Sequence, residues 1–231
     1  MTNIKLDSRL RTVASLVRKG SVTADIGTDH GYLICWLIQN GICPEGIAAD
    51  LRKGPLENAE KTVKECGLTE KVRLYLSDGL KALPENCADD IVIAGMGGIL
   101  ITEIISAAEW LFNKNIRIIA QPMTHAEVLR EFLINNGFRI LEEKTATDGK
   151  HFYCTLCAEF FGKGISCADS YYYLGELLKN DDEITKKYID KMIFTLEKKC
   201  IALKNAKLDE SVVLEKLIDE IKTKVSEANN D

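Results

Sequence analysis

The chain has 231 residues, of which 46% are hydrophobic and 28% charged, a composition typical of a globular protein with one full core and an accessory unit. Its formal net charge of −5 argues against a strongly basic nucleic-acid-binding protein, although a local basic patch remains compatible with it. No apolar run approaches the roughly 18–20 residues of a membrane span, and the amino terminus lacks a secretory signal, so we expect a cytoplasmic protein without membrane association.

Short β-branched or apolar runs alternate with longer helical patterns from residue 22 onwards. Strands are predicted at Val22–Ile26, Gly46–Asp50, Val72–Leu76, Asp90–Ala94 and Ile116–Ala120. Helices are predicted between and after them at Leu33–Gln39, Gly54–Cys66, Ile99–Phe112 and Thr124–Asn136. Such alternation predicts a parallel sheet with helices on both of its faces.

Two further strands follow without a long helix between them. They are predicted at Arg139–Thr145 and His151–Phe160, and the pair Asp148-Gly149 between them is typical of a β-hairpin. The sheet is therefore expected to end in an antiparallel pair. The fold class that follows is α/β, a mostly parallel Rossmann-like sheet.

The composition changes after about residue 162, which divides the chain into a domain at 1–162 and a helical unit at 163–231. Proline is absent from the second part, and two amphipathic patterns predict an antiparallel, coiled-coil-like helical hairpin. In its first helix Lys187, Lys191 and Lys198 share one face, here called the lysine stripe. This stripe is either a solvated face or a surface that follows RNA phosphates.

The eight cysteines are mostly single. The one close pair, Cys154 and Cys157, lies three residues apart in a predicted strand, so the two thiols should point to opposite faces. No second pair or paired histidines complete a zinc set. We expect reduced thiols and no bound metal.

The run Asp25-x-Gly27-x-Asp29-x-Gly31 lies at the first strand-to-helix turn, where parallel sheets bind ligands. Glycines there let the backbone approach a ligand and offer N–H donors. The spacing resembles the nucleoside loop of class I methyltransferases. Acids also end or follow the next two strands: Asp50 is placed to accept ribose hydroxyls, and Asp78 to meet an adenine amino group.

Other interpretations of this run remain open. A metal site would use Asp25, Asp29 and His30, although adjacent Asp29 and His30 rarely aim at one ion. His30 alone is also compatible with a helix cap or a backbone contact. A nicotinamide-dependent oxidoreductase would show G-x-G-x-x-G, and Asp29 stands where its second glycine would be.

The fourth strand ends in "AGMGG", where Gly95, Gly97 and Gly98 offer a floor without side chains against which a planar base can lie. The fifth strand ends in "AQPMTH", which presents Gln121 and Pro122 at the same rim. Together the two strand ends predict a place for a substrate base beside the nucleoside.

With these motifs in place, the chain resembles the bacterial tRNA (adenine-N1)-methyltransferases that modify adenine 22. The resemblance rests on "DSRL", "ADIGTDHGYL", "KGPLENA", "SDGL", "IAGMGG", "QP" and "DGKHFY", which follow one another over nearly the whole chain. It implies a class I S-adenosylmethionine domain, a coiled-coil-like unit, S-adenosylmethionine as cofactor and tRNA as substrate. Two departures concern substrate details: Met123 stands where the family often has Asn, and Cys154 where it often has Glu.

The site expected on this basis has three parts. The cofactor residues are Asp25, Gly27, Thr28, His30, Gly31, Asp50, Asp78, Gly79, Ala94, Gly95 and Met96. The catalytic candidates are Asp29, to stabilise charge that develops on the base, and Tyr153, either to stack on it or simply to pack in the core. The tRNA contacts are Arg9, Gly97, Gly98, Gln121, Pro122, Lys187, Lys191 and Lys198.

Two alternatives to adenine N1 methylation stay open: a non-catalytic RNA-binding protein that keeps the fold, and a methyltransferase for another nucleic-acid base. The expected assembly is a monomer or weak dimer.

Overall fold

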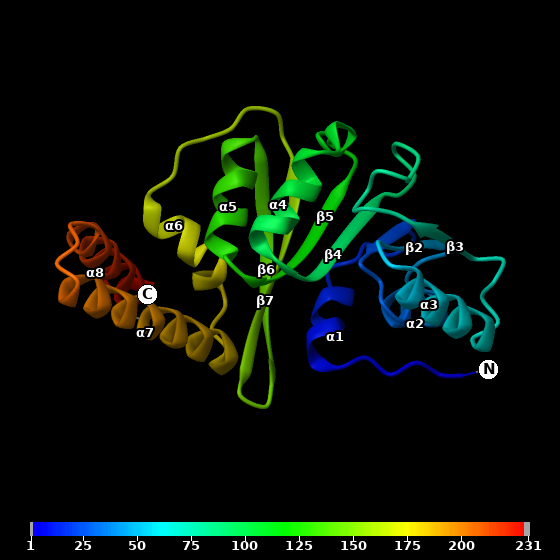
Figure 1. Cartoon of the computed structure of the whole chain (residues 1–231), viewed down its shortest axis with the longest axis horizontal. Coiled ribbons are helices and arrows are strands. Elements are labelled where there is room, and N and C mark those ends of the chain that lie inside the picture. The colour runs from blue at the N-terminus through cyan, green and yellow to red at the C-terminus, as the bar shows by residue number, and fades with distance from the viewer. Residues whose placement is uncertain (1, 229–231) are drawn as a thin grey trace.

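The computed structural model describes residues 2–228, and within them seven strands form one sheet in the order β3-β2-β1-β4-β5-β7-β6 (Figure 1). The strands are β1 (Thr23–Ile26), β2 (Gly46–Asp50), β3 (Val72–Leu76), β4 (Asp90–Gly97), β5 (Arg117–Thr124), β6 (Phe138–Asp148) and β7 (His151–Phe160). β1 to β5 run parallel, and β7 pairs antiparallel with β5 and β6. This is the predicted Rossmann-like sheet with an antiparallel end.

The central strands β1 and β2 are buried along their whole length, as expected for parallel strands that helices cover on both faces. Their register places Ile26 of β1 beside Ala49 of β2 and Ile93 of β4. The carboxyl ends of these three strands therefore lie together at one edge, and the turns that follow them share one space.

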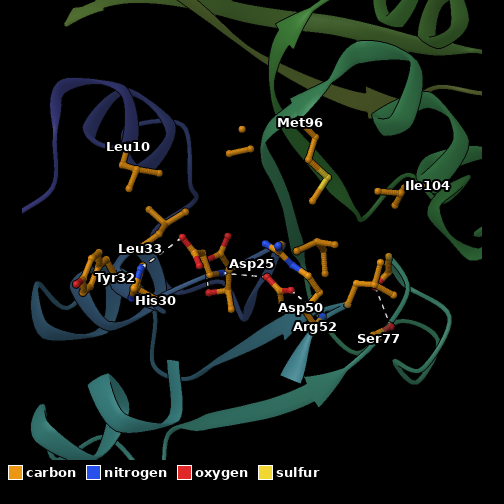
Figure 2. Close-up of a pocket in the computed structure, with 18 of the residues that line it drawn as sticks. Leu10, Asp25, His30, Tyr32, Leu33, Asp50, Arg52, Ser77, Met96 and Ile104 are labelled. Atoms are coloured by element: carbon orange, nitrogen blue, oxygen red, sulfur yellow. Dashed lines mark hydrogen bonds and ion pairs between the residues drawn. The ribbon is translucent and has the colours of Figure 1, made fainter. Parts of the chain in front are cut away.

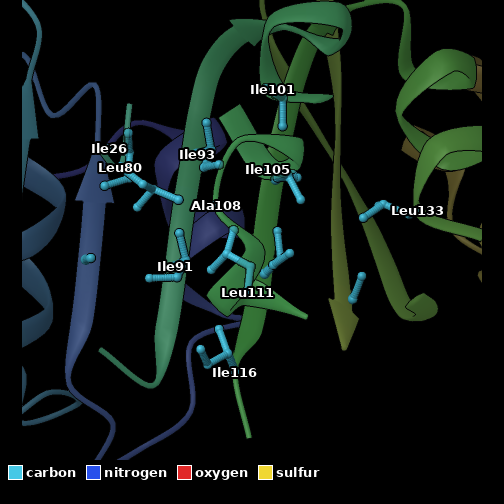
Figure 3. Close-up of a cluster of buried hydrophobic side chains, with 14 of the residues drawn as sticks. Ile26, Leu80, Ile91, Ile93, Ile101, Ile105, Ala108, Leu111, Ile116 and Leu133 are labelled. Carbon is cyan, nitrogen blue, oxygen red and sulfur yellow. The ribbon is translucent and has the colours of Figure 1, made fainter. Parts of the chain in front are cut away.

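Helices cover both faces of the sheet and extend beyond it. They are α1 (Ser8–Ala14), α2 (Tyr32–Gln39), α3 (Lys53–Glu65), α4 (Gly98–Ser106), α5 (Ala126–Asn135), α6 (Asp169–Leu174), α7 (Glu183–Asn205) and α8 (Glu210–Ala228), with short 3-10 helices η1 (Glu109–Leu111) and η2 (Leu177–Lys179). Apolar side chains of α1, α2 and α3 pack on one face, and those of α4 and α5 on the other. Figure 3 shows Ile91 and Ile93 of β4 among the side chains of the second face.

α6, α7 and α8 form the helical unit, which has a core of its own beside β7 (Figure 1). Leu177, Ile189, Leu196 and Ile221 are buried there, and Cys154 of β7 joins the same cluster. Cys157 lies in the cluster on the opposite face, as its spacing from Cys154 predicted. All eight cysteines are free thiols.

The predicted helix over Ile99–Phe112 is wrong in its second half. α4 ends at Ser106, and the backbone of Ala108 leaves the helical region before η1 begins. Ala108 and Leu111 both still face the core on either side of this break. β4 and β5 also continue past their predicted ends, with register shifts around Met96. No helix within the described part of the chain is both long and apolar enough to cross a membrane.

Candidate functional site

A cavity of about 610 Å³ opens at the carboxyl ends of β1, β2 and β4, between α1 and α4 (Figure 2). Its volume is in the range of small-molecule sites. Most of the predicted cofactor residues line it: Asp25, Gly27, Thr28, His30, Asp50, Asp78, Gly79, Ala94, Gly95 and Met96. Asp29 and Arg9 line it too.

The turn at residues 25–31, here the glycine turn, is held by its own backbone. The amides of Gly27 and Thr28 both donate to the carbonyl of Ala49, at 2.8 and 3.0 Å, which ties the turn to the end of β2. Gly27 has a φ of 75°, a left-handed conformation that favours glycine, and Met96 Cε packs in the space that a Cβ would fill. The cavity wall is therefore largely main chain at this point.

Asp50 ends β2 with its carboxylate already oriented. Oδ1 accepts the amide of Arg52 at 2.9 Å, and Oδ2 accepts the amide of Asp29 at 3.3 Å. The side chain is buried at the cavity wall, yet each oxygen keeps a second lone pair. A carboxylate fixed in this way can accept two neighbouring hydroxyls of a sugar.

Asp25 is buried below the glycine turn. Burial raises its pKa to about 6, while a hydrogen bond from Thr28 Oγ1 at 2.7 Å and the nearby charge of Arg9 act in the opposite direction. The group therefore titrates close to neutral pH, and a cationic ligand in the cavity would favour its ionised form.

The turn after β3 forms the far end of the cavity. The amide of Ser77 donates to the carbonyl of Asp50 at 2.8 Å, and Ser77 Oγ donates to the carbonyl of Gly79 at 2.9 Å. These bonds hold Asp78 at this end of the cavity, where its solvent-exposed carboxylate pairs with Lys81. The amino group of a base that approaches edge-on can take the place of Lys81 as the hydrogen-bond partner of this carboxylate.

At the other end, Asp29 and His30 face the opening. Asp29 takes a left-handed backbone conformation, with φ of 54°, and its carboxylate lies 3.6 Å from His30 Nε2. The His30 ring stacks on Tyr32 with 5.2 Å between ring centroids, and both side chains are partly exposed (Figure 2). A residue held in this uncommon conformation beside a cavity is typical of a functional site.

Arg9 reaches the cavity from α1 through a bond to a buried side chain. Its Nη1 donates to Gln121 Oε1 at 2.9 Å, and the same oxygen accepts the amide of Gly95 at 3.1 Å. The Gln121 amide nitrogen donates to the carbonyl of Pro122. Gln121 is fully buried, so it orients Arg9 and the end of β4 and does not face the cavity.

Several predicted residues lie outside the cavity wall. Gly31 packs against Ala59 of α3, and Gly97 and Gly98 lie beside Thr124 and His125 at the β5 end. Tyr153 is half-buried in β7 opposite Ala146. The others outside the wall are Pro122 and the lysine stripe, which is exposed on α7.

Sequence reasoning missed part of the wall. Leu51 and Arg52 follow Asp50, Tyr32 begins α2, and Leu100 and Ile104 project from α4. Leu51 and Arg52 could have been predicted from the sequence, because they directly follow the strand-end acid Asp50. The α4 residues carry no such mark, because their helical pattern is that of any core-facing helix.

The polar groups of the cavity suit a nucleoside with a charged tail: a fixed carboxylate for a diol, a second acid for a base edge, and an arginine with a buried acid. Nowhere in residues 2–228 do three His, Cys, Asp or Glu side chains gather as a metal site requires.

Comparison with known proteins agrees with this geometry. Residues 6–156 match the model of a family described as "Methyltransferase domain". The chain is 36% identical over 159 residues to the tRNA (adenine(22)-N(1))-methyltransferase of Bacillus subtilis, covering 69% of this chain and 67% of that one.

Two solved structures extend the likeness over the whole chain. The B. subtilis m1A22 tRNA methyltransferase TrmK superposes with a TM-score of 0.82 and 30% identity, covering 98% of this chain and 99% of that one. Streptococcus pneumoniae Sp1610 in complex with S-adenosyl-L-methionine gives a TM-score of 0.79 and 32% identity, covering 95% and 99%.

Proposed function

The chain belongs to the family of bacterial tRNA (adenine-N1)-methyltransferases, and from this premise we propose that it methylates N1 of adenine 22 in tRNA with S-adenosylmethionine. The observation that carries the proposal is the pre-oriented Asp50 carboxylate between the glycine turn and the turn after β3. That arrangement suits an adenosine ribose, and the cofactor brings one.

The cofactor is proposed to lie along the cavity with its ribose on Asp50 and its adenine edge at Asp78. Its amino-acid tail then reaches the glycine turn, where Asp25 offers a counter-charge to the ammonium group. The sequence predicts Arg9 as a tRNA contact, but it lines this same cavity and is proposed as the partner of the cofactor carboxylate. Thr28, His30, Gly79, Ala94 and Met96 complete the wall.

Catalysis needs positioning more than proton transfer. Bound S-adenosylmethionine would supply an electrophilic methyl group. The in-plane lone pair of adenine N1 would accept this methyl without prior deprotonation, as the methyl–sulfur bond breaks and S-adenosylhomocysteine is released. The chain aligns the two reactants, with Gly95 and Gly97 at the end of β4 as a floor for the base. Gly98 is buried against the His125 carbonyl and takes no part in that floor. The methylated base carries a positive charge, which the exposed Asp29 carboxylate stabilises. Tyr153 stays a candidate for stacking on the base.

The tRNA body is proposed to follow the helical unit. Lys187, Lys191 and Lys198 are all exposed on α7, and Lys191 Nζ donates to the carbonyl of Lys150 at the tip of the β6–β7 hairpin. The stripe and the hairpin tip thus form one surface. Affinity for a polyanion depends on such local cations and not on net charge.

We also propose that the protein acts in the cytoplasm, where its tRNA substrate is found, as a monomer or weak dimer.

The test is incubation with methyl-labelled S-adenosylmethionine and unmodified tRNA, followed by nucleoside mapping. One methyl group on N1 of adenine 22 is the expected result. Cofactor binding without transfer would instead favour a non-catalytic RNA-binding protein, and label on another nucleotide would favour a methyltransferase for a different base.

A further inference from the structure

A buried ion pair that the cofactor site does not use lies where the helical unit meets the sheet. Arg130 of α5 donates from Nε to Oε1 of Glu143 of β6 at 2.9 Å, and the two side chains are 1% and 0% exposed. Transfer of both charges out of water is costly unless further hydrogen bonds satisfy them. The partners of those further hydrogen bonds therefore show which segments of the chain the ion pair fixes in place.

Most of the remaining bonds go to one stretch of backbone, residues 172–176, here the connecting segment. The others go to Cys154 of β7, whose Sγ accepts from Arg130 Nη2 at 3.6 Å and donates to Glu143 Oε1 at 3.4 Å. Arg130 Nη1 donates to the carbonyls of Tyr172 and Tyr173, both at 3.0 Å. These carbonyls belong to the last turn of α6. Carbonyl groups at that end of a helix have no hydrogen-bond partner within the helix itself. Glu143 Oε2 accepts the amide of Glu176 at 2.6 Å.

Gly175 passes directly over the pair. It has a φ of 52°, and a Cβ at this position would overlap the Glu143 carboxylate and lie 2.7 Å from Arg130 Nε. Only a residue without a side chain lets the backbone come this close. The connecting segment is thus folded around the two charges.

Contacts continue along the same strand toward α7. Asn180 Nδ2 donates to the carbonyl of Glu143 at 2.8 Å, and the hydroxyls of Thr145 and Thr185 lie 2.8 Å apart. The start of α7 is therefore fixed to β6 as well. The ion pair is thus the first of a series of contacts along β6 that fix the start of α7 and so set the direction of this helix.

We propose that Arg130 and Glu143 are positioning residues for the tRNA: by holding the connecting segment, they set the orientation of α7 and its lysine stripe relative to the cofactor cavity. The inference rests on the proposed tRNA methylation. A substrate that contacts both regions at once is aligned for transfer only when their separation is fixed. The bonds to two carbonyls and an amide satisfy the buried charges and at the same time fix the path of the connecting segment.

The test uses variants of the full chain. Arg130→Met with Glu143→Leu replaces the pair by apolar side chains of similar size, which proteins often tolerate, while removing every bond to the connecting segment. Gly175→Ala keeps both charges and displaces the segment. Glu159→Gln is the matched control, because the Arg117–Glu159 pair joins β5 and β7 at 2.8 Å without touching the helical unit.

In both test variants KM for tRNA should rise roughly tenfold or more, while kcat and the affinity for S-adenosylmethionine stay within about twofold. The control should change none of them. Activities are referred to the folded fraction, measured by thermal unfolding. If the double variant does not fold, Glu143→Gln takes its place, since it keeps the size of the side chain and removes its charge.

A second readout measures the orientation itself. Ketone-bearing amino acids at Lys61 of α3 and Lys216 of α8, both exposed, accept spin labels without involving the eight cysteines. The wild type should give one narrow distance distribution, and both test variants a broad one. A narrow distribution in the folded variants overturns the inference, and so does a broad one with an unchanged KM for tRNA. A wild type that leaves tRNA unmethylated overturns the proposed function instead.

Discussion

The cofactor cavity and the Arg130–Glu143 junction both depend on carboxylates, but they are built in different ways. The cavity takes its acids from the ends of β1 and β2 and from the turns after β1 and β3, each within a short run of sequence. The junction joins one side chain from α5, one from β6 and the backbone of residues 172–176. Functional groups at strand ends are thus carried by local sequence, whereas the placement of one unit on another is carried by distant residues that meet only in the fold.

The largest expected effect lies at the junction. Glu143→Leu alone leaves Arg130 charged and buried without its partner, and should lower the free energy of unfolding by about 3–5 kcal/mol. Adding Arg130→Met should recover most of that loss. Urea unfolding of the two variants checks this, and equal stability of the single and double variants would show that the charges are not coupled.

Next in size is the cofactor cavity. Asp50→Ala removes an acceptor whose two oxygens are already oriented, and should weaken S-adenosylmethionine binding by about 1–3 kcal/mol. Calorimetric titration measures the change, with Glu57→Ala on the exposed side of α3 as the control. Unchanged affinity would place the ribose elsewhere.

A smaller effect separates binding from turnover within the site. The backbone of Gly97 has an ordinary φ of −68°, so Gly97→Ala requires only a small shift of Thr124 Oγ1, 3.2 Å from the new Cβ. Turnover should fall by roughly tenfold as the floor for the base is filled, at unchanged cofactor affinity. Gly54→Ala, where a Cβ meets open space, is the control. A parallel loss of affinity would assign Gly97 to the cofactor pocket.

The smallest effect concerns pH. Burial raises the pKa of Asp25 to about 6, so a cationic cofactor binds best when this group is ionised. Affinity should rise with pH up to about 6 and then level off, with one proton released on binding below that value. The stability of the free protein should change in the opposite sense, falling as pH rises from about 4 to 6, because the folded state binds the extra proton. Titration in buffers of different ionisation enthalpy measures the release, and Asp25→Asn should abolish it.

The same contrast explains what the sequence predicts. The positions of the strands, the mostly parallel sheet and the cavity acids follow from alternating apolar runs and strand-end residues, and α7 and α8 follow from their helical period. The role of Gln121 does not, because a polar residue after a predicted strand has the same pattern whether it faces a ligand or is buried and holds an arginine at the cavity. Arg130 and Glu143 resemble solvated charges on a helix and a strand, and only the packing of distant segments, among them the connecting segment and Cys154 of β7, encloses them.

The central claim, that the strand-end turns hold the cofactor while the helical unit holds the tRNA, is tested most directly by one crossed kinetic measurement. KM for S-adenosylmethionine and KM for tRNA are measured across a salt series for Asp50→Ala and for the triple variant Lys187→Glu, Lys191→Glu and Lys198→Glu. Asp50→Ala should raise only the first constant, and the triple variant only the second, with a weaker salt dependence than the wild type. A triple variant with wild-type KM for tRNA at every salt concentration would contradict the account.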